Sequence, residues 1–343
     1  MIIGDLHIGA RNSNKIVEHW QQRFFEEQFW PYIEQHNIKN IIQLGDWFDN
    51  RRWINLNSMA FNKAMMVDKI NELNITVHTM IGNHDIPYKH SLANNSPQQI
   101  MGHEPNINIW QEPGNFTIDD VNFTMIPWIC KENEVECMEA IQEGGDICIG
   151  HFEIAGFNMM QNHKNIDGLN ASLFEKWNTV WSGHFHTQSK NANIHYLGTP
   201  YQMSWNDFMP KNGFWVFDTH DRSLVFINNP LRYFHRIEWN DGSNYPVENI
   251  ENSYVKLSIK KKTDFEAFEK FLDKINFHRP FELKVLEDFE EYSSENIEDL
   301  INVASTQELI NQYIDDVSTE KVNKGKVKEI MQDIYKISLE VEE

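Results

Sequence analysis

The sequence predicts an α/β fold: a layered domain of strands and helices, then a small αβ module, then a C-terminal helical segment. Three observations indicate this. Strand-like and helix-like stretches alternate up to about residue 230, five strand-like runs each end at a glycine, and two amphipathic stretches close the chain. With 343 residues the chain is long enough for one large domain and a smaller one.

Short hydrophobic runs supply the predicted strands of the first domain. The residues 17–35 and 58–73, which lie between the first three runs, have the spacing of helices, so the pattern is that of βαβ units. Later runs, NFTMIPWI, NIHYLG and GFWVFD, are typical of hairpin strands, so we expect mixed sheets. The five glycine-ended runs are MII before Gly4, NIIQL before Gly45, ITVHTMI before Gly82, DICI before Gly150 and NTVWS before Gly183.

A domain boundary is expected in residues 230–250, which are rich in Asn, Pro and Gly. Beyond it, YVKLSI and FELKVL are typical of strands and enclose a predicted helix over residues 264–275. An acidic stretch follows, and residues 306–317 and 322–339 each carry an apolar stripe at helical spacing. We therefore predict domains at 1–235 and 236–288, a linker at 289–305 and a helical segment at 306–343.

The composition sets limits on function. A formal net charge of −21 argues against a nucleic-acid binder, but residues 287–320 alone hold eleven Asp or Glu and no Lys or Arg. The excess is thus concentrated in one late segment. No apolar run is long enough to span a membrane and no signal peptide is evident. The three cysteines fit no zinc or disulfide spacing and indicate reduced thiols in a cytoplasmic protein.

Each of the five glycines is followed at once by residue types that bind metals. In an α/β sheet such residues gather at the carboxyl ends of the strands, so we expect them to converge. Carboxylates supply charge and can bridge two ions, whereas imidazoles and an amide oxygen complete the shells, a mixture that suits Mn²⁺, Fe²⁺ or Zn²⁺ better than Mg²⁺. The alternative is that these polar residues only cap strands. The five segments are Asp5-Leu6-His7, Asp46-Trp47-Phe48-Asp49, Asn83-His84-Asp85, His151 and His184-Phe185-His186.

In this order the five blocks resemble the calcineurin-like metallophosphoesterases, whose pattern is D-x-H, G-D-x-x-D, G-N-H-D/E, G-H and G-H-x-H. The resemblance covers residues 1 to about 200 and implies a two-sheet sandwich flanked by helices. It implies that Asp5, His7 and His186 hold one metal ion. It further implies that Asn83, His151 and His184 hold a second ion, and that Asp46 bridges the two. The first strand, MII, is shorter than is usual in the family.

Three further residues receive catalytic roles from the resemblance. His84 would stabilise the transition state or protonate the leaving oxygen, and Asp85 would orient it. Asp49 stands where many nucleases of the family have histidine, and would orient a ligand or a water molecule. Arg51 and Arg52 directly follow the G-D-x-x-D block, so they are candidate contacts for DNA phosphates, although each is individually more often a solvated surface charge.

The blocks IQLGDWFDNRR, VWSGHFHT and YLGTPYQMSW resemble recombination-nuclease subunits of double-strand-break repair, especially the version found in T-even-type bacteriophages. This resemblance implies a Mn²⁺-preferring, two-metal DNA phosphodiesterase, with Mg²⁺ as the alternative ion, located in the cytoplasm of a bacterial host. The αβ module would be a DNA-capping domain. A phosphatase for phosphomonoesters and a non-catalytic scaffold are the rival interpretations.

Two partner surfaces are expected on the same grounds. The C-terminal helices would dock on the coiled coil of an SMC-like ATPase, and the alternative is a self-packed helical hairpin. The helix at 58–73 is apolar nearly all round, so it would either form a homodimer seam or pack entirely in the core. The apolar residues of this helix are Met59, Phe61, Met65, Met66, Val67 and Ile70.

Overall fold

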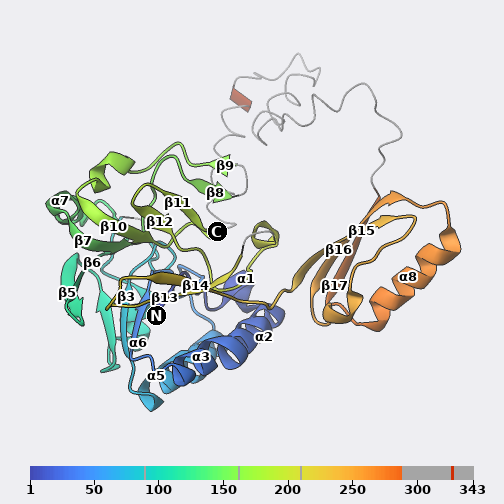
Figure 1. Ribbon diagram of the computed structural model, residues 1–343, viewed down its shortest axis with the longest axis horizontal. Coiled ribbons are helices and arrows are strands. Elements are labelled where there is room, and N and C mark those ends of the chain that lie inside the picture. The colour runs from blue at the N-terminus through green and yellow to red at the C-terminus, as the bar shows by residue number, and fades with distance from the viewer. Residues whose placement is uncertain (89, 161–162, 209–210, 288–325, 328–343) are drawn as a thin grey trace. The chain divides into compact units, whose positions relative to one another are not determined.

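A computed structural model describes residues 1–88, 90–160, 163–208, 211–287 and 326–327 (Figure 1). The chain divides into two compact units. Among the described residues, the first comprises 1–237, 244–256 and 269–284, and the second comprises 238–243, 257–268, 285–287 and 326–327. Within the described part, no helix is both long enough and apolar enough to cross a membrane.

The first of two large sheets has the strand order β14-β13-β1-β2-β3-β4. Strands β1 to β4 run parallel, and β13 pairs with β1 in the antiparallel sense. Although β1 has only two residues, Ile2 pairs with both Trp215 and Ile42, so the short first strand lies inside the sheet. The strands are β1 (Ile2–Ile3), β2 (Asn40–Gln43), β3 (Thr76–Met80), β4 (Ile107–Trp110), β13 (Gly213–Phe217) and β14 (Leu224–Asn228).

The second large sheet has the order β11-β12-β10-β7-β6-β5. Its central strands β12, β10, β7 and β6 run parallel, whereas hairpins add β11 and β5 at the two edges. The strands are β5 (Gly114–Ile118), β6 (Val121–Ile126), β7 (Gly145–Gly150), β10 (Trp177–Ser182), β11 (Ser189–Asn191) and β12 (Ile194–Tyr196). Both sheets are therefore mixed, as the sequence predicts.

The two sheets pack face to face, because successive side chains of a strand point to opposite faces. Ile2 and Ile42 of the first sheet join Ile147 and Trp181 of the second in one buried cluster. Their neighbours point outward: Ile3 and Ile41 pack in the cluster that contains the aromatic side chains of the helices, and Cys148 and Val180 pack on the other outer face. The predicted two-sheet sandwich with flanking helices is confirmed.

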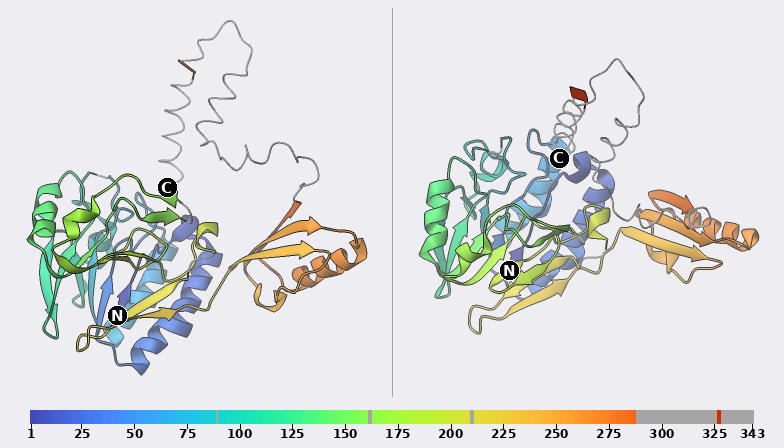
Figure 2. Two further views of the ribbon diagram at one scale, coloured as in Figure 1. Left: turned by 45° about the horizontal axis from the view of Figure 1, so that its top comes forward. Right: turned by 90° about the horizontal axis from the view of Figure 1, so that it is seen from above.

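Two long helical stretches cover the first sheet (Figures 1 and 2). Residues 15–35 form α2 (Lys15–Phe24), the π-helical turn η1 (Phe25–Phe29) and α3 (Trp30–Gln35). Residues 56–72 form α4 (Leu56–Asn62), η2 (Lys63–Val67) and α5 (Asp68–Glu72). Both match the predicted helices to within a few residues. The other described helices before residue 230 are α1 (Ala10–Ser13), α6 (Ser96–Met101) and α7 (Glu134–Glu143), with the short turns η3 (Ala171–Phe174) and η4 (Trp205–Asp207). A small hairpin is formed by β8 (Asn158–Met160) and β9 (His163–Lys164).

A third sheet, in the order β15-β16-β17, follows the sandwich in the chain. Its elements are β15 (Phe234–Asn240), η5 (Val247–Asn249), β16 (Tyr254–Lys261), α8 (Phe265–Phe277) and β17 (Glu282–Glu287). The strand–helix–strand order of the predicted αβ module is present. The expected boundary at 230–250 is wrong in part, because it contains β15. The predicted linker and the C-terminal helices lie outside the described residues, apart from Lys326 and Val327.

Candidate metal centre

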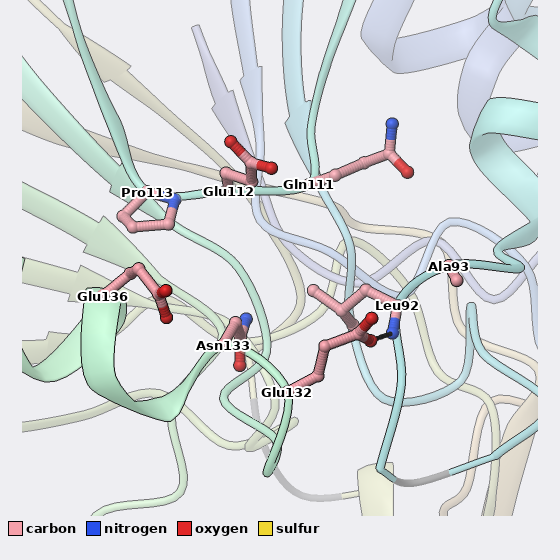
Figure 3. Close-up of a pocket in the computed structure, with 8 residues that line it drawn as sticks. All are labelled: Leu92, Ala93, Gln111, Glu112, Pro113, Glu132, Asn133 and Glu136. Carbon is pink, nitrogen blue, oxygen red and sulfur yellow. Dashed lines mark hydrogen bonds between the residues drawn. The ribbon is translucent and has the colours of Figure 1, made fainter.

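One hollow in the first unit does not fit a phosphate ester. It encloses about 380 Å³ and is lined by three glutamates, Glu112, Glu132 and Glu136 (Figure 3). Glu132 accepts a hydrogen bond from the main-chain N–H of Leu92 at 2.8 Å. Because carboxylates repel phosphate, and none of the predicted ligands lines this hollow, it is not the metal site that the motifs predict.

Parallel strands of both sheets end at the same edge of the sandwich, and the predicted ligands follow them. Asp5 and His7 follow β1, Asp46 follows β2 and Asn83 follows β3, whereas His151 follows β7 and His184 with His186 follow β10. Hydrogen bonds from main-chain N–H groups of one motif to oxygens of another hold the motifs together. The N–H groups of Leu6 and His7 both donate to the Asp46 carbonyl at 3.0 Å, and the His184 N–H donates to the Asp5 carboxylate at 3.1 Å.

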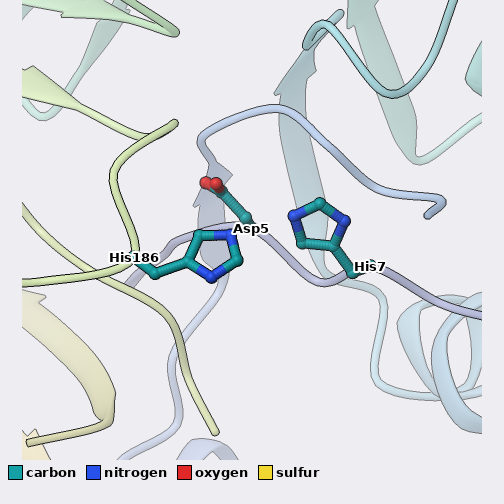
Figure 4. Close-up of side chains that lie close together, drawn as sticks. All are labelled: Asp5, His7 and His186. Carbon is teal, nitrogen blue, oxygen red and sulfur yellow. The ribbon is translucent and has the colours of Figure 1, made fainter. Parts of the chain in front are cut away.

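One group of ligand atoms comes from Asp5, His7 and His186, whose side chains face a common space (Figure 4). One ligand atom from each lies within 4.8 Å of the other two. Asp5 and His7 are almost fully buried, and His186 is one-third exposed. This is the set that the resemblance assigns to the first metal ion.

A second group consists of Asp46, His151 and His184, again with one atom of each within 4.8 Å of the others. The Asn83 amide oxygen joins them, since it lies 2.9 Å from His151 Nε2 and 2.9 Å from His184 Nδ1. Asp46 lies between the two groups, because its Oδ2 is 3.2 Å from His151 Nε2 and 3.7 Å from His7 Nε2. The structure thus brings all seven predicted ligands together.

The donor set fits divalent cations. His7 Nε2 is buried without a hydrogen bond, which is costly unless a charged partner meets it. Burial opposes protonation of His7, yet the carboxylates of Asp49, Asp46 and Asp5 outweigh it and raise the His7 pKa to about 9. Carboxylates therefore draw a proton onto this imidazole, and a divalent cation would displace that proton.

The two histidines of the second group have pKa values shifted in opposite directions. Burial opposes protonation of His151, but Asp46 and then Asp5 raise its pKa to about 9. Burial and the neighbouring positive charge of His151 hold the pKa of His184 well below its usual value. His184 is thus a neutral imidazole, the form that ligates a metal. Mixed nitrogen and oxygen donors of this kind suit Mn²⁺, Fe²⁺ or Zn²⁺.

In three of the four ligand imidazoles, a ring nitrogen meets an oxygen that does not belong to the seven predicted ligands. His7 Nδ1 lies 3.1 Å from Asp49 Oδ1, a position that suits orienting a ligand, one of the two roles expected for Asp49. His151 Nδ1 lies 2.7 Å from the Leu44 carbonyl oxygen. His186 Nδ1 lies 3.5 Å from Oδ1 of Asp207, a buried carboxylate in η4 that the sequence analysis missed.

Asp207 is itself rigidly held. Its Oδ2 accepts hydrogen bonds from the main-chain N–H of Met203 at 2.9 Å and of Ser204 at 2.8 Å. Ser204 in turn caps η4, so the pair forms a capping box. The signal in the sequence is only the Ser204-x-x-Asp207 spacing, which predicts a helix start and not a partner for a distant histidine. Carboxylates behind ligand histidines fix the ring orientation and raise the basicity of the ligand.

His84 is near the first group but is held differently from the ligands. Its Nδ1 lies 2.7 Å from the Asp49 carbonyl oxygen, and its main-chain N–H donates to Asp46 Oδ1 at 2.7 Å. A further compact group is formed by His7, Asp49 and His84. The expectation that Asp85 orients His84 is wrong. Asp85 instead accepts from the N–H groups of Phe48 and Gly82, and so ties two motif loops together.

Backbone strain marks the same loops. His7, Asp46 and His184 have φ values of 43°, 51° and 80°, a left-handed conformation that non-glycine residues rarely adopt. The loops are also packed too closely for larger residues: a Cβ on Gly82 would lie 2.1 Å from Asp46 Oδ1. Three of the seven ligands are therefore held in conformations that the surrounding fold must enforce.

The two arginines expected near the substrate differ in position. The positive charge of Arg51 is among the influences that lower the pKa of His84, after burial, so Arg51 lies close to the site. Arg52 is exposed, and its main-chain N–H donates to Asn50 Oδ1 at 3.0 Å. Arg51 is the better placed of the two to meet a phosphate next to His84.

Comparisons with known proteins agree with this geometry. The sequence model of a family described as Calcineurin-like phosphoesterase matches residues 1–188, which contain all seven predicted ligands. The chain is also 30% identical over 314 residues to "Exonuclease subunit 1" of Enterobacteria phage T4, and the match covers 91% of each chain.

Proposed function

The chain belongs to the calcineurin-like phosphoesterase family, and from this premise we propose that it is a Mn²⁺-dependent DNA nuclease subunit acting in recombination and repair. The observation that carries the proposal is the shared position of Asp46 between two groups of ligand atoms. Two cations that share a carboxylate sit about 3.5–4 Å apart and clamp a phosphoryl group during in-line displacement. The name of the phage relative supports DNA as the substrate, which the metal ligands alone do not choose.

The chain's own residues divide the work. Asp5, His7 and His186 would hold the first cation, Asn83, His151 and His184 would hold the second, and Asp46 would contribute to both. When bound, the two cations lower the pKa of water and neutralise phosphate charge. His84 Nδ1 faces the Asp49 carbonyl, which leaves Nε2 for the substrate. In its protonated form His84 donates from Nε2 to the leaving oxygen, and no covalent bond to the enzyme is needed.

The test compares substrates. The purified protein is incubated with Mn²⁺ and either end-labelled DNA or a chromogenic phosphomonoester, with Asp46→Asn as the matched inactive control. We expect wild-type protein to cleave DNA. Asp46→Asn should be inactive and should lose at least one of two bound Mn²⁺ ions, because one neutral oxygen cannot hold two cations together. Cleavage of the monoester alone would establish the phosphatase, and cleavage of neither would support the scaffold.

We further propose that the protein works as a subunit with an SMC-like ATPase, through the predicted helices at 306–343. The phage relative is named as a subunit, which supports a partner. The acidic composition of residues 287–320 suits a tether that orders a following segment on binding. These helices lie outside the described residues, so the proposal rests on the apolar stripes of the sequence.

A homodimer is also proposed, but on fewer side chains than the sequence suggested. Phe61, Met66, Val67 and Ile70 of the 56–72 stretch are buried in the core and Met65 packs against it. The apolar surface that remains is at the start of the stretch, where Leu56 is 79% exposed, Trp53 50% and Met59 37%. Sedimentation at increasing protein concentration tests whether this surface, small for a stable interface, associates.

A further inference from the structure

A small cavity lies beside the second ligand group and is not explained by metal binding. It encloses about 190 Å³, and Trp128, Ile129, Phe152, Leu169 and the buried ring of His151 are among its lining residues. Pockets that hold drug-sized ligands are roughly 300–1,000 Å³, so this one suits a single planar ring system. Trp128 follows β6 at the same edge of the sandwich that delivers the metal ligands.

Trp128 lines the cavity and also lies next to the second ligand group. Its ring lies 5.2 Å from the ring of His184 and 6.0 Å from that of His151, measured between centroids, and it is half-buried. Its main chain is fixed, because the Trp128 N–H donates to the Ile81 carbonyl at 2.8 Å and its carbonyl accepts from Asn133 Nδ2 at 3.1 Å. Trp128 is therefore a rigid aromatic surface directly beside two ligand imidazoles.

Gly168, Leu169 and Glu153 form another well-defined part of the lining. Leu169 and Glu153 are joined by a hydrogen bond from the Leu169 N–H to the Glu153 carbonyl at 2.8 Å, and Ala155 N–H donates to the Leu169 carbonyl at 3.0 Å. Gly168 lies so close that a Cβ would be 2.4 Å from the Glu153 oxygen. The main chain of Trp128 and that around Leu169 are both held by hydrogen bonds, so the lining of the cavity is preformed, and most of its residues are apolar.

We propose that this cavity is a subsite for one nucleobase of the cleaved strand, which stacks on Trp128 while its phosphate lies at the metal centre. The inference rests on the proposed nuclease function. A base next to the scissile phosphate must lie beside the ligands, and this cavity is apolar, preformed and of the right size. Stacking on an aromatic side chain is tolerant of sequence, so the subsite would position a strand without selecting its bases.

The test is a cycle of protein and substrate changes. Wild type and Trp128→Ala are each assayed on a labelled oligonucleotide and on copies in which a single abasic residue is moved along the strand past the cleavage position. We expect wild type to lose about 10- to 100-fold in kcat/KM at one abasic position, the range typical of one aromatic–base stack. Trp128→Ala should be slowed to a similar extent on intact DNA and should show little further loss at that position.

Controls separate positioning from ligation and from the nuclease assignment itself. Trp128→Phe should recover part of the rate, and Val225→Ala, which removes an exposed apolar side chain outside the cavity, should leave the abasic effect intact. Leu169→Trp, which fills the cavity, should reproduce Trp128→Ala. Loss of bound Mn²⁺ in Trp128→Ala, or equal abasic effects in wild type and Trp128→Ala, would overturn the subsite. If wild type does not cleave DNA at all, it is the nuclease function that fails.

Discussion

His84 is the residue at which metal binding and chemistry can be separated. It belongs to a compact group with His7 and Asp49, yet its Nδ1 is engaged by a main-chain carbonyl oxygen. We predict that His84→Ala keeps both Mn²⁺ ions and DNA binding but lowers turnover by roughly 10²–10⁴-fold, the contribution typical of a general acid. Metal content and single-turnover rate are measured on the same preparation. A fall in Mn²⁺ content together with the rate would make His84 a ligand.

Asp207 provides a second test at the same scale. Asp207→Asn keeps the size of the side chain but removes the negative charge that faces His186 Nδ1. We expect the affinity of one of the two Mn²⁺ ions to fall by about 10- to 100-fold, the usual cost of changing a partner of a ligand histidine. Calorimetric titration with Mn²⁺ should resolve one weakened and one unchanged site. Asp241→Asn, which removes a carboxylate paired with Lys261, is the matched control. Equal binding by wild type and Asp207→Asn would contradict this role.

Single residues also show where prediction from sequence stops. The convergence of the seven candidate ligands could be predicted because each follows a strand and a glycine, whereas their selection and their division between two ions came from the family resemblance. Asp207 and Trp128 could not, because their importance comes from which strands are neighbours in space. Asp85 shows the same limit in reverse: its place next to His84 in the chain suggested a contact, but its carboxylate turns to the Phe48 and Gly82 amides.

Among the elements, β3 contains a histidine whose charge state bears on stability. The His78 ring stacks on Phe116 with a centroid distance of 4.0 Å, and Trp110 Nε1 donates to His78 Nδ1 at 3.3 Å. Burial lowers the pKa of His78 to about 4. The unfolded chain, with an ordinary histidine pKa near 6.5, therefore binds a proton more readily than the folded one as the pH falls from about 6.5 to 4.

We predict that His78 lowers the free energy of unfolding as the pH falls through that window. Above pH 6.5 the neutral ring is accommodated in both states, and below it protonation favours unfolding by on the order of 1–2 kcal/mol, allowing for partial exposure. His78→Phe keeps the stack but cannot be protonated. The stability difference between wild type and His78→Phe, from denaturant titrations at several pH values, should shift in favour of the variant as pH falls. A difference independent of pH would count against the prediction.

The elements themselves were predictable to different degrees. Strands such as β2 and β7 are short apolar runs that lead to a glycine, and this pattern is easily recognised in the sequence. The sequence around β15 predicts a domain boundary because Pro, Asn and Gly surround the strand. Its buried residues Phe234, Ile237 and Trp239 do not stand out within so polar a segment. The assignment of each strand to one of two sheets depends on long-range pairing, which no local pattern contains.

For the whole molecule, the separation of ligands from the C-terminal segment yields a clear prediction. Every proposed ligand lies at or before His186, so deletion of residues 305–343 should leave cleavage of a short single-stranded substrate nearly unchanged. It should abolish co-purification with an SMC-like ATPase and any stimulation by ATP on duplex DNA. Leu309→Asp combined with Ile314→Asp should do the same, because charge would enter the proposed apolar seam.

The self-packed hairpin makes a different prediction for that double variant. It expects a lower melting temperature of the isolated protein and largely intact binding to the ATPase. Melting temperature and partner pull-down measured on one preparation decide between the two. A destabilised variant that still binds the ATPase would end the docking proposal.

The distribution of ligands over two sheets also bears on how such an enzyme is made. On the proposed assignment, the first cation needs His186 and the second needs His184, so both shells stay incomplete until the ribosome has passed the middle of the 343-residue chain. A nascent or prematurely terminated product that stops before β10 has neither shell. On the proposed function, hydrolysis of DNA would thereby be withheld from every fragment that has not yet assembled both sheets, and unfinished copies would leave the DNA around the site of synthesis uncut.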